Sequence, residues 1–210
     1  MYTLYYSPGS ASMAVHLLLL ELGVPHLLRL IDFDRRQQND PDYLRLNPNG
    51  LVPTLVVEGT AYYECAALLL LLGERHPEAA LAPAVGSRER GVYLQWMLHL
   101  ANTLQPAFRQ WFYPSDFGPA GQEQDMREFA RQRIEAVWNR LESHLAAYGP
   151  CVLGVQLSIA DLYATMLMRW SRNMPKPADR WPALAALAAR VKSRSSWQRL
   201  YQIEGLTEWP

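Results

Sequence analysis

The sequence has no excess of charge of either sign. Its 20 Lys and Arg residues balance its 20 Asp and Glu residues, so the formal net charge at pH 7 is +0. Adjacent basic residues occur only as scattered pairs such as Arg35-Arg36. A nucleic-acid-binding protein needs a basic surface that neutralises phosphates, so the charge balance argues against a nucleic-acid partner.

Cysteine is almost absent from the chain. The two that occur, Cys65 and Cys151, are far apart and belong to no CxxC or His-Cys spacing. This scarcity excludes a disulfide framework and gives no support to a zinc site. We therefore expect a reduced, cytoplasmic protein that needs no metal.

Long apolar stretches are also missing. The longest run, residues 66–72, is too short to cross a bilayer. The N-terminus opens with the alternating segment 2–6 and lacks the basic, apolar and small-residue pattern of a signal peptide. We expect no membrane association, which agrees with a cytoplasmic location.

What the chain does have is enough apolar residues for two compact units. It contains 210 residues, of which 50% are hydrophobic. Strand patterns cover residues 2–6, 25–31, 52–57 and 60–63, and helix patterns cover a segment ending near 23, then 40–46 and 65–75. Short links between the first strand, helix and second strand predict a right-handed parallel βαβ unit. The order βαβ-α-ββα is that of an α/β thioredoxin-like domain, here residues 1–76.

The rest of the chain is predicted to be helical. Residues 77–86 are rich in Pro, Ala and Gly and form the expected linker to an all-α helical bundle domain, residues 87–210. Two long amphipathic helices are expected over 87–112 and 123–148. Ser158 and Asp161 have the spacing of a reciprocal N-terminal cap, which predicts another helix start.

The most informative motif is Asn47-Pro48-Asn49-Gly50-Leu51-Val52-Pro53-Thr54-Leu55. Pro53 cannot donate a hydrogen bond to a sheet, so Val52 must lie at an edge or a bend with free backbone groups. A cis bond before Pro53 would aim those groups at a ligand as one antiparallel rung. The motif therefore predicts a peptide-like ligand, and Asn47 and Asn49 are interpreted as turn formers.

This motif, followed by a hairpin and by Tyr63-Glu64-Cys65-Ala66, resembles the glutathione-binding half of the glutathione S-transferases. The resemblance implies that Val52, with Pro53, pairs with the cysteinyl part of glutathione. It also implies that Glu64 and Cys65 hold the γ-glutamyl ammonium and carboxylate. Cys65 replaces the usual serine, so a hydroxyl donor is lost while the backbone N–H remains. Near the other end, Gly154, Ser158, Ala160 and Asp161 resemble the folding motif of the family's helical domain.

The segment Tyr5-Tyr6-Ser7-Pro8-Gly9-Ser10-Ala11-Ser12 resembles the bacterial beta class, Tyr-Tyr-Ser-Pro-Gly-Ala-Cys-Ser. The signature cysteine of that class falls at Ala11, which removes mixed-disulfide chemistry there. The family places a Tyr, Ser or Cys here to stabilise the glutathione thiolate, the reactive nucleophile. Ser10 and Ser12 are the candidate catalytic residues, and helix capping is the alternative role for either. Tyr6 is expected to face the glutathione site, since strand alternation turns Tyr5 toward the core.

Aromatic residues of the helical part are candidates for an electrophile pocket. Trp96, Met97 and Phe108 have the spacing of a helix core. The consecutive Trp111, Phe112 and Tyr113 cannot all face one way, so at least one is expected to be exposed. His16 and His99 lack partners at metal-ligand spacing and are interpreted as ordinary helix residues.

Two functions remain open from the sequence. The first is a glutathione transferase, a homodimer as the resemblance implies, that joins glutathione to a small apolar electrophile. The second is a non-catalytic protein of the same fold that acts as a binding or regulatory module. The loss of a cysteine at Ala11 favours the second function, whereas Val52, Pro53 and Glu64 favour retained glutathione binding.

Overall fold

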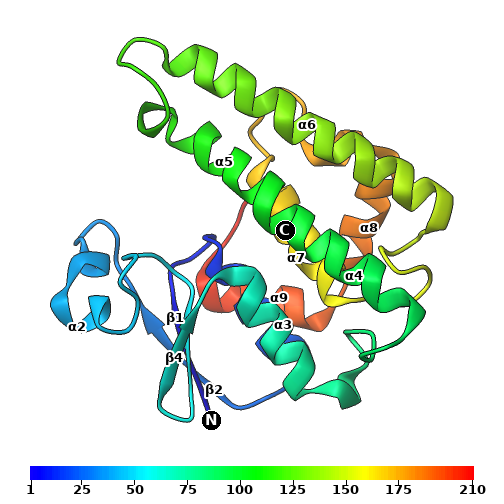
Figure 1. Cartoon of the computed structure of the whole chain (residues 1–210), viewed down its shortest axis with the longest axis horizontal. Coiled ribbons are helices and arrows are strands. Elements are labelled where there is room, and N and C mark those ends of the chain that lie inside the picture. Colours follow the sequence, from blue (N-terminus) through cyan, green and yellow to red (C-terminus); the bar gives the residue numbers. More distant parts are fainter. The chain divides into compact units, whose positions relative to one another are not determined.

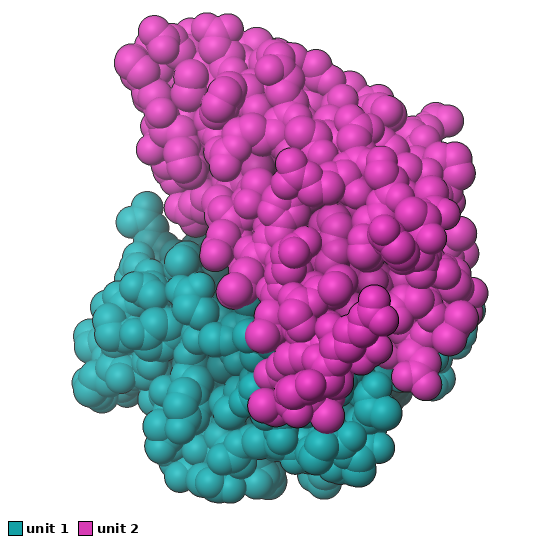
Figure 2. Space-filling view, turned by 45° about the vertical axis from the view of Figure 1, so that its right-hand side comes forward, with its two compact units in different colours: residues 1–82, 192–210 teal, residues 83–191 magenta.

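The computed structural model describes residues 1–210, which form two compact units (Figure 2). The first contains Met1–Ala82 and Lys192–Pro210, and the second contains Pro83–Val191. The division expected from the sequence differs from this one at its end, because it places residues 192–210 in the helical domain. In the structure they group with the N-terminal segment instead.

The first unit is built on a four-stranded sheet with the order β2-β1-β3-β4. Its strands are β1 (Tyr2–Tyr6), β2 (His26–Leu30), β3 (Thr54–Val57) and β4 (Thr60–Tyr63). β1 and β2 are parallel, as predicted for the βαβ unit, and the other two pairings are antiparallel. The predicted α/β fold of this part is therefore confirmed, with strand ends differing by one or two residues.

The helices of the first unit are α1 (Ser12–Glu21), α2 (Pro41–Leu44), α3 (Cys65–Arg75) and α9 (Ser195–Glu204), with short 3₁₀ turns at Gln37–Asn39 and Pro77–Ala79. α1 packs against both α3 and α9. Its residues from Ser12 to Leu19 are all buried. A helix that is apolar on all its faces must be covered on several sides, and α9 supplies part of that cover.

The second unit is helical, as predicted (Figure 1). It contains α4 (Arg88–His99), a π-helical turn (Leu100–Leu104), α5 (Gln105–Phe112), α6 (Glu123–Tyr148), α7 (Ile159–Trp170) and α8 (Pro182–Lys192), with 3₁₀ turns at Pro114–Asp116 and Ala178–Arg180. α5 and α6 lie side by side, and α7 is buried along nearly its whole length. No helix of the chain combines the length and the apolar character that crossing a membrane requires.

The helix expected over residues 87–112 is interrupted by the π-helical turn Leu100–Leu104. The physical reason lies in Pro106, the second residue of α5. Proline has no N–H, so it cannot donate to the carbonyl four residues earlier, at Asn102. A widened π turn accommodates such a local loss of helical hydrogen bonding without ending the helical segment.

The predicted helix start at Ser158 is confirmed by a reciprocal capping box. The buried Asp161 carboxylate accepts hydrogen bonds from the backbone N–H of Ser158 at 2.7 Å and from that of Val152 at 2.8 Å. The Ser158 hydroxyl also donates to this carboxylate, at 2.7 Å. Burial raises the pKa of Asp161, although these hydrogen bonds act against the increase. The cap therefore fixes both the start of α7 and the preceding loop.

A polar contact ties the C-terminal segment to α1 within the first unit. Arg194, which precedes α9, pairs with the mostly buried carboxylate of Glu21 at the end of α1. Ser196 donates to the same carboxylate. Burial alone would raise the pKa of Glu21, but the hydrogen bonds from Arg194 and Ser196 lower it overall.

We expect Arg194→Gln to lower the free energy of unfolding by about 1 kcal/mol at pH 7, since the pair is partly exposed. A lowered carboxyl pKa contributes stability above its ordinary value of 4.5, and this contribution is lost as pH falls through the folded value. Urea unfolding at pH 7 and at lower pH should show the difference from wild type shrinking below that value. Arg199→Gln, an exposed change on the adjoining helix α9, is the control. An equal loss at both pH values would refute an ionic role.

Candidate functional site

Three loops of the first unit meet at the end of its sheet where β1 and β4 finish and β3 begins. This end of the sheet is called the sheet edge below. Tyr5 of β1 pairs with Thr54 of β3, and Thr54 pairs with Tyr63 of β4. Because β1 and β4 both run antiparallel to β3, this row of three residues lies at the ends of β1 and β4 and at the start of β3. The segments that begin at Tyr6, end at Pro53 and begin at Glu64 therefore emerge side by side. The pairing brings together the three motifs selected from the sequence.

The segment after β1 carries a compact hydroxyl cluster. Ser12 is fully buried, and its hydroxyl accepts from the Ser7 N–H at 3.1 Å and donates to the Ser7 carbonyl at 3.1 Å. Ser10 is half-buried and donates to the same carbonyl at 2.7 Å. The two hydroxyl oxygens are 2.8 Å apart. The structure thus joins both candidate residues in one hydrogen-bond network.

The hydroxyls of Ser10 and Ser12 differ in how available they are to a ligand. All contacts of the Ser12 hydroxyl lie inside the protein, and no part of the residue is exposed. Ser10 is only half-buried, and its hydroxyl shares the Ser7 carbonyl with Ser12. If the Ser10 hydroxyl donates its hydrogen bond to a nearby anion instead, the Ser12 hydroxyl still donates to the Ser7 carbonyl. Ser10 is therefore suited to contact a ligand, and Ser12 is suited to orient Ser10.

A buried carboxylate below this segment was not found from the sequence. Glu204, from α9, accepts from the Gly9 N–H at 2.8 Å and contacts His16 Nδ1 at 2.7 Å. His16 lies within α1, as interpreted from the sequence, and is fully buried, so it makes a polar contact inside the fold. Burial and the negative charge of Glu204 raise the pKa of Tyr6, which keeps its phenol neutral. No local signal links residues 9 and 16 to residue 204, because the contact spans nearly the whole chain.

The loop before β3 leaves the backbone of Val52 free, as predicted. The Val52–Pro53 peptide bond is cis, and neither the N–H nor the C=O of Val52 takes part in a hydrogen bond of the chain. Buried Asn47 organises this loop: its side-chain amide donates to the Leu51 carbonyl at 2.8 Å and to Thr54 Oγ1 at 3.1 Å. Asn47 is therefore a turn former, as interpreted from the sequence.

The start of α3 presents an exposed carboxylate beside free backbone donors. Glu64 precedes the helix with a φ of 74°, a backbone conformation that is uncommon for a residue with a side chain. Its carboxylate has no partner within the chain and is exposed. The first N–H groups of α3 have no carbonyl to bond, so they can receive an anion. An ammonium and a carboxylate on one ligand would suit this pair of features.

Cys65 directs its side chain away from this position. The residue is 4% exposed, and its thiol donates to the Ala11 carbonyl at 3.4 Å. Burial, together with the charge of Glu64, raises the pKa of the thiol well above its ordinary range. Its backbone N–H at the helix start is the part of Cys65 that remains available to a ligand.

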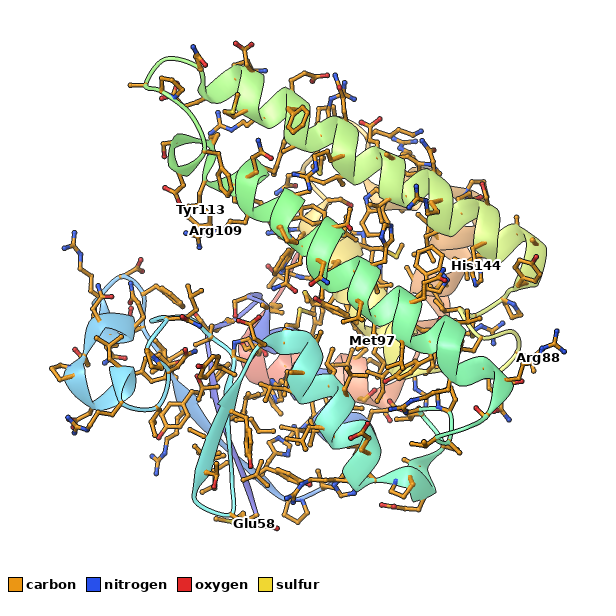
Figure 3. The ribbon with its side chains drawn as sticks, in the orientation of Figure 1. Glu58, Arg88, Met97, Arg109, Tyr113 and His144 are labelled. Atoms are coloured by element: carbon orange, nitrogen blue, oxygen red, sulfur yellow. The ribbon has the colours of Figure 1, made fainter.

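The aromatic residues of the second unit divide between core and surface. Trp96, Met97 and Phe108 are buried. Phe112 and Tyr113, at the end of α5, are exposed, and Trp111 is half-buried. The Arg109 guanidinium lies 4.7 Å from the centre of the Tyr113 ring, and Figure 3 shows the two side chains next to each other. The expectation that at least one of the three consecutive aromatics is exposed is confirmed.

Taken together, the sheet edge offers the recognition elements for a short, charged peptide-like molecule. These are one free backbone rung, a carboxylate, a helix start and the hydroxyl of a half-buried serine. No group of three or more His, Cys, Asp or Glu side chains is close enough to hold a metal ion. On one ligand, the backbone rung would pair with a peptide backbone and the carboxylate with an ammonium. The helix start would bind a carboxylate, and the hydroxyl a polar or anionic atom.

Two family models match the chain. Residues 9–75 match the glutathione S-transferase N-terminal domain, and residues 102–198 match the glutathione S-transferase C-terminal domain. Among curated relatives, glutathione S-transferase GstA of Escherichia coli O157:H7 is 28% identical over 205 residues, which cover 97% of this chain and 98% of that protein.

Solved structures agree in fold over the full chain. BphK, described as a bacterial GST and solved as a ternary complex, is 32% identical with a TM-score of 0.86, covering 97% of this chain and 100% of that one. A glutathione transferase homologue from Sulfitobacter, solved with bound glutathione, is 28% identical with a TM-score of 0.89, covering 99% of both chains. A Sphingomonas chungbukensis enzyme of the bacterial beta class is 28% identical with a TM-score of 0.84, covering 98% of this chain and 100% of that one.

Proposed function

Since this chain belongs to the glutathione S-transferase family, we propose that it binds glutathione and joins the sulfur to a small apolar electrophile. The observation that carries the proposal is the row Tyr5–Thr54–Tyr63, which gathers the three ligand-recognising segments at one edge. In the reaction, the thiolate forms a bond to an electrophilic carbon, and a leaving group departs or a double bond accepts the electron pair.

Each part of glutathione has a matching element at this edge. The free N–H and C=O of Val52, presented by the bend at Pro53, would pair with the backbone of the cysteinyl unit. The Glu64 carboxylate would hold the γ-glutamyl ammonium, and the Cys65 N–H at the start of α3 would receive the γ-glutamyl carboxylate. Tyr6, half-buried at the end of β1, would line the site near the sulfur.

Ser10 is the hydroxyl that we propose to stabilise the thiolate, with Ser12 as its orienting partner. Ser10 is half-buried and can donate outward, because Ser12 satisfies the shared Ser7 carbonyl in its place. The hydroxyl also lies beside the start of α1, where the helix dipole favours an anion. A donor to the thiolate lowers the thiol pKa and raises the reactive fraction at pH 7.

The three consecutive aromatic residues at the end of α5 are the proposed electrophile pocket. Trp111, Phe112 and Tyr113 provide apolar ring surface that suits a small apolar substrate. The alternative function, a non-catalytic module, is favoured by the alanine at position 11. It differs from the enzyme in one measurable respect, since a module would bind glutathione without lowering its thiol pKa.

The proposed assembly is a homodimer in the cytoplasm. Exposed apolar side chains occur on each unit, among them Tyr62 and Tyr63 on the first and Val92 and Leu98 on the second. Such side chains are typical of surfaces that become covered in an isologous contact. The two cysteines are free thiols, which agrees with a reducing compartment.

Ser10→Ala should lower kcat about 10²–10³-fold, the usual effect of removing one donor to an anion in a shielded site. Glutathione affinity should change little, and the pKa of bound glutathione, followed by thiolate absorbance, should rise. Ser12→Ala should raise the pKa of bound glutathione by less than Ser10→Ala does. It should also lower thermal stability, since the Ser12 hydroxyl is buried. If wild-type protein binds glutathione without a lowered thiol pKa, the non-catalytic function is correct. Absence of binding would reject both functions.

Glu64→Gln should raise KM for glutathione about tenfold, because the γ-glutamyl ammonium loses a charged partner that is not part of the transition state. The KM for a chromogenic aryl halide should hardly change. Glu89→Gln is the matched control, since Glu89 is also an exposed glutamate at a helix start. Equal increases in both KM values would instead indicate a general collapse of the site.

A dimeric mass is expected in light scattering at micromolar concentration. Mutation of an exposed apolar residue, Leu98→Glu, should shift the mass toward the monomer if α4 contributes to the contact. A monomeric mass for the wild-type protein would contradict the proposed assembly.

A further inference from the structure

This chain has a cysteine at a different position from the bacterial beta class that it resembles. Residue 11, where that class has cysteine, is alanine, and residue 65, where the family usually has serine, is cysteine. These two positions are neighbours in space, because Cys65 Sγ lies 3.4 Å from the Ala11 carbonyl oxygen. The thiol of this chain therefore contacts the backbone of the residue that lacks one.

The Cys65 thiol is placed to act as a hydrogen-bond donor and not as a nucleophile. It is buried at the first residue of α3, and the exposed Glu64 carboxylate precedes it. Burial and this negative charge raise the thiol pKa, so the proton stays on sulfur at neutral pH. A protonated thiol has a single hydrogen, and here that hydrogen is directed to the Ala11 carbonyl.

This contact joins two parts of the candidate site. Ala11 lies between Ser10 and Ser12, so its carbonyl belongs to the segment that holds the hydroxyl cluster. Cys65 belongs to the helix whose start would receive the carboxylate of glutathione. The sheet pairing sets the two segments at one edge, and the thiol is a direct side-chain link between them.

We propose that Cys65 is a positioning residue, whose thiol holds the Ala11 carbonyl and thereby keeps the Ser10 hydroxyl in place relative to α3. The inference rests on the proposed function, since it concerns the same glutathione site. Its consequence is a division of roles at position 65: the side chain stabilises the catalytic segment, and the ligand carboxylate is held by backbone N–H groups alone.

Serine cannot fill both roles at this position. A C–O bond is shorter than a C–S bond, and a hydroxyl needs a donor–acceptor distance of about 2.5–3.0 Å. A serine hydroxyl on the present backbone would therefore fall short of Ala11 and be free to donate to a ligand carboxylate. A cysteine at position 65 makes no side-chain contact with the ligand, but its thiol holds the segment that contains Ala11.

The test compares Cys65→Ser and Cys65→Ala with Cys151→Ser, which changes the other buried thiol in the second unit. Both changes at residue 65 should lower kcat about three- to tenfold and raise the pKa of bound glutathione, because the Ser10 hydroxyl is less well placed. Cys65→Ser alone should bind glutathione more tightly, by about tenfold, through its new hydroxyl donor. Cys151→Ser should alter none of these three values.

Three results would overturn the inference. Unchanged kcat and bound-thiol pKa in both Cys65 variants would show that the contact positions nothing. Equal affinities of Cys65→Ser and Cys65→Ala would show that a hydroxyl at position 65 does not reach the ligand, so that no division of roles exists there. Reaction of the folded wild-type protein with oxidised glutathione, in which Cys65 gains one glutathionyl group and one glutathione is released, would show a nucleophilic thiol. This last measurement by mass spectrometry needs no variant and remains decisive if either variant folds poorly.

Failure of the proposed function is recognised separately. Wild-type glutathione binding is measured first, and its absence rejects the glutathione site as a whole. If the wild-type protein binds and turns over glutathione but the two Cys65 variants do not show the expected differences, only the role assigned to Cys65 is rejected.

Discussion

The pairing register of the sheet is the constraint on which the site depends. One row of residues, Tyr5–Thr54–Tyr63, crosses three strands, and at this row the chain leaves β1 and β4 and enters β3. A shift of one residue in this register would turn every side chain of the shifted strand to the opposite face of the sheet. It would also separate the Val52 rung from the serine segment. The buried Leu4 and Leu55, which pair with each other, oppose such a shift because it would expose them.

Buried polar contacts then set the loops that the sheet only brings together. Asn47 fixes the bend before β3, Ser12 holds the segment after β1, and Glu204 anchors Gly9 from the far end of the chain. A buried polar group is costly unless it is hydrogen-bonded, so each of these contacts favours a single loop conformation. This explains how short loops can present free backbone groups and the hydroxyl of half-buried Ser10 without losing their shape.

The helical unit illustrates a different balance between local and non-local effects. Its long helix α6 matches the bounds predicted from amphipathic periodicity, since nothing in that segment opposes helical hydrogen bonding. The segment before it was predicted as one helix, yet Pro106 removes a single donor and a π turn results. The exposed Phe112 and Tyr113 follow from geometry alone, because consecutive helix residues point in different directions. The packing of the unit decides only which of the three aromatics is covered.

The sequence alone determined the features that depend on neighbouring residues: the βαβ unit, the bend at Val52–Pro53, the capping box at Ser158 and Asp161, and the start of α3. Each follows from local periodicity, from the missing N–H of proline or from the hydrogen-bonding groups of residues three or four apart. The tertiary structure decided the rest. It grouped residues 192–210 with the first unit, brought Glu204 to Gly9 and His16, made Ser12 inaccessible, and turned the Cys65 thiol to Ala11. The contacts of Glu204 and Cys65 join residues 54 to 195 positions apart, and such pairs leave no local pattern because only packing of the whole unit brings them within bonding distance.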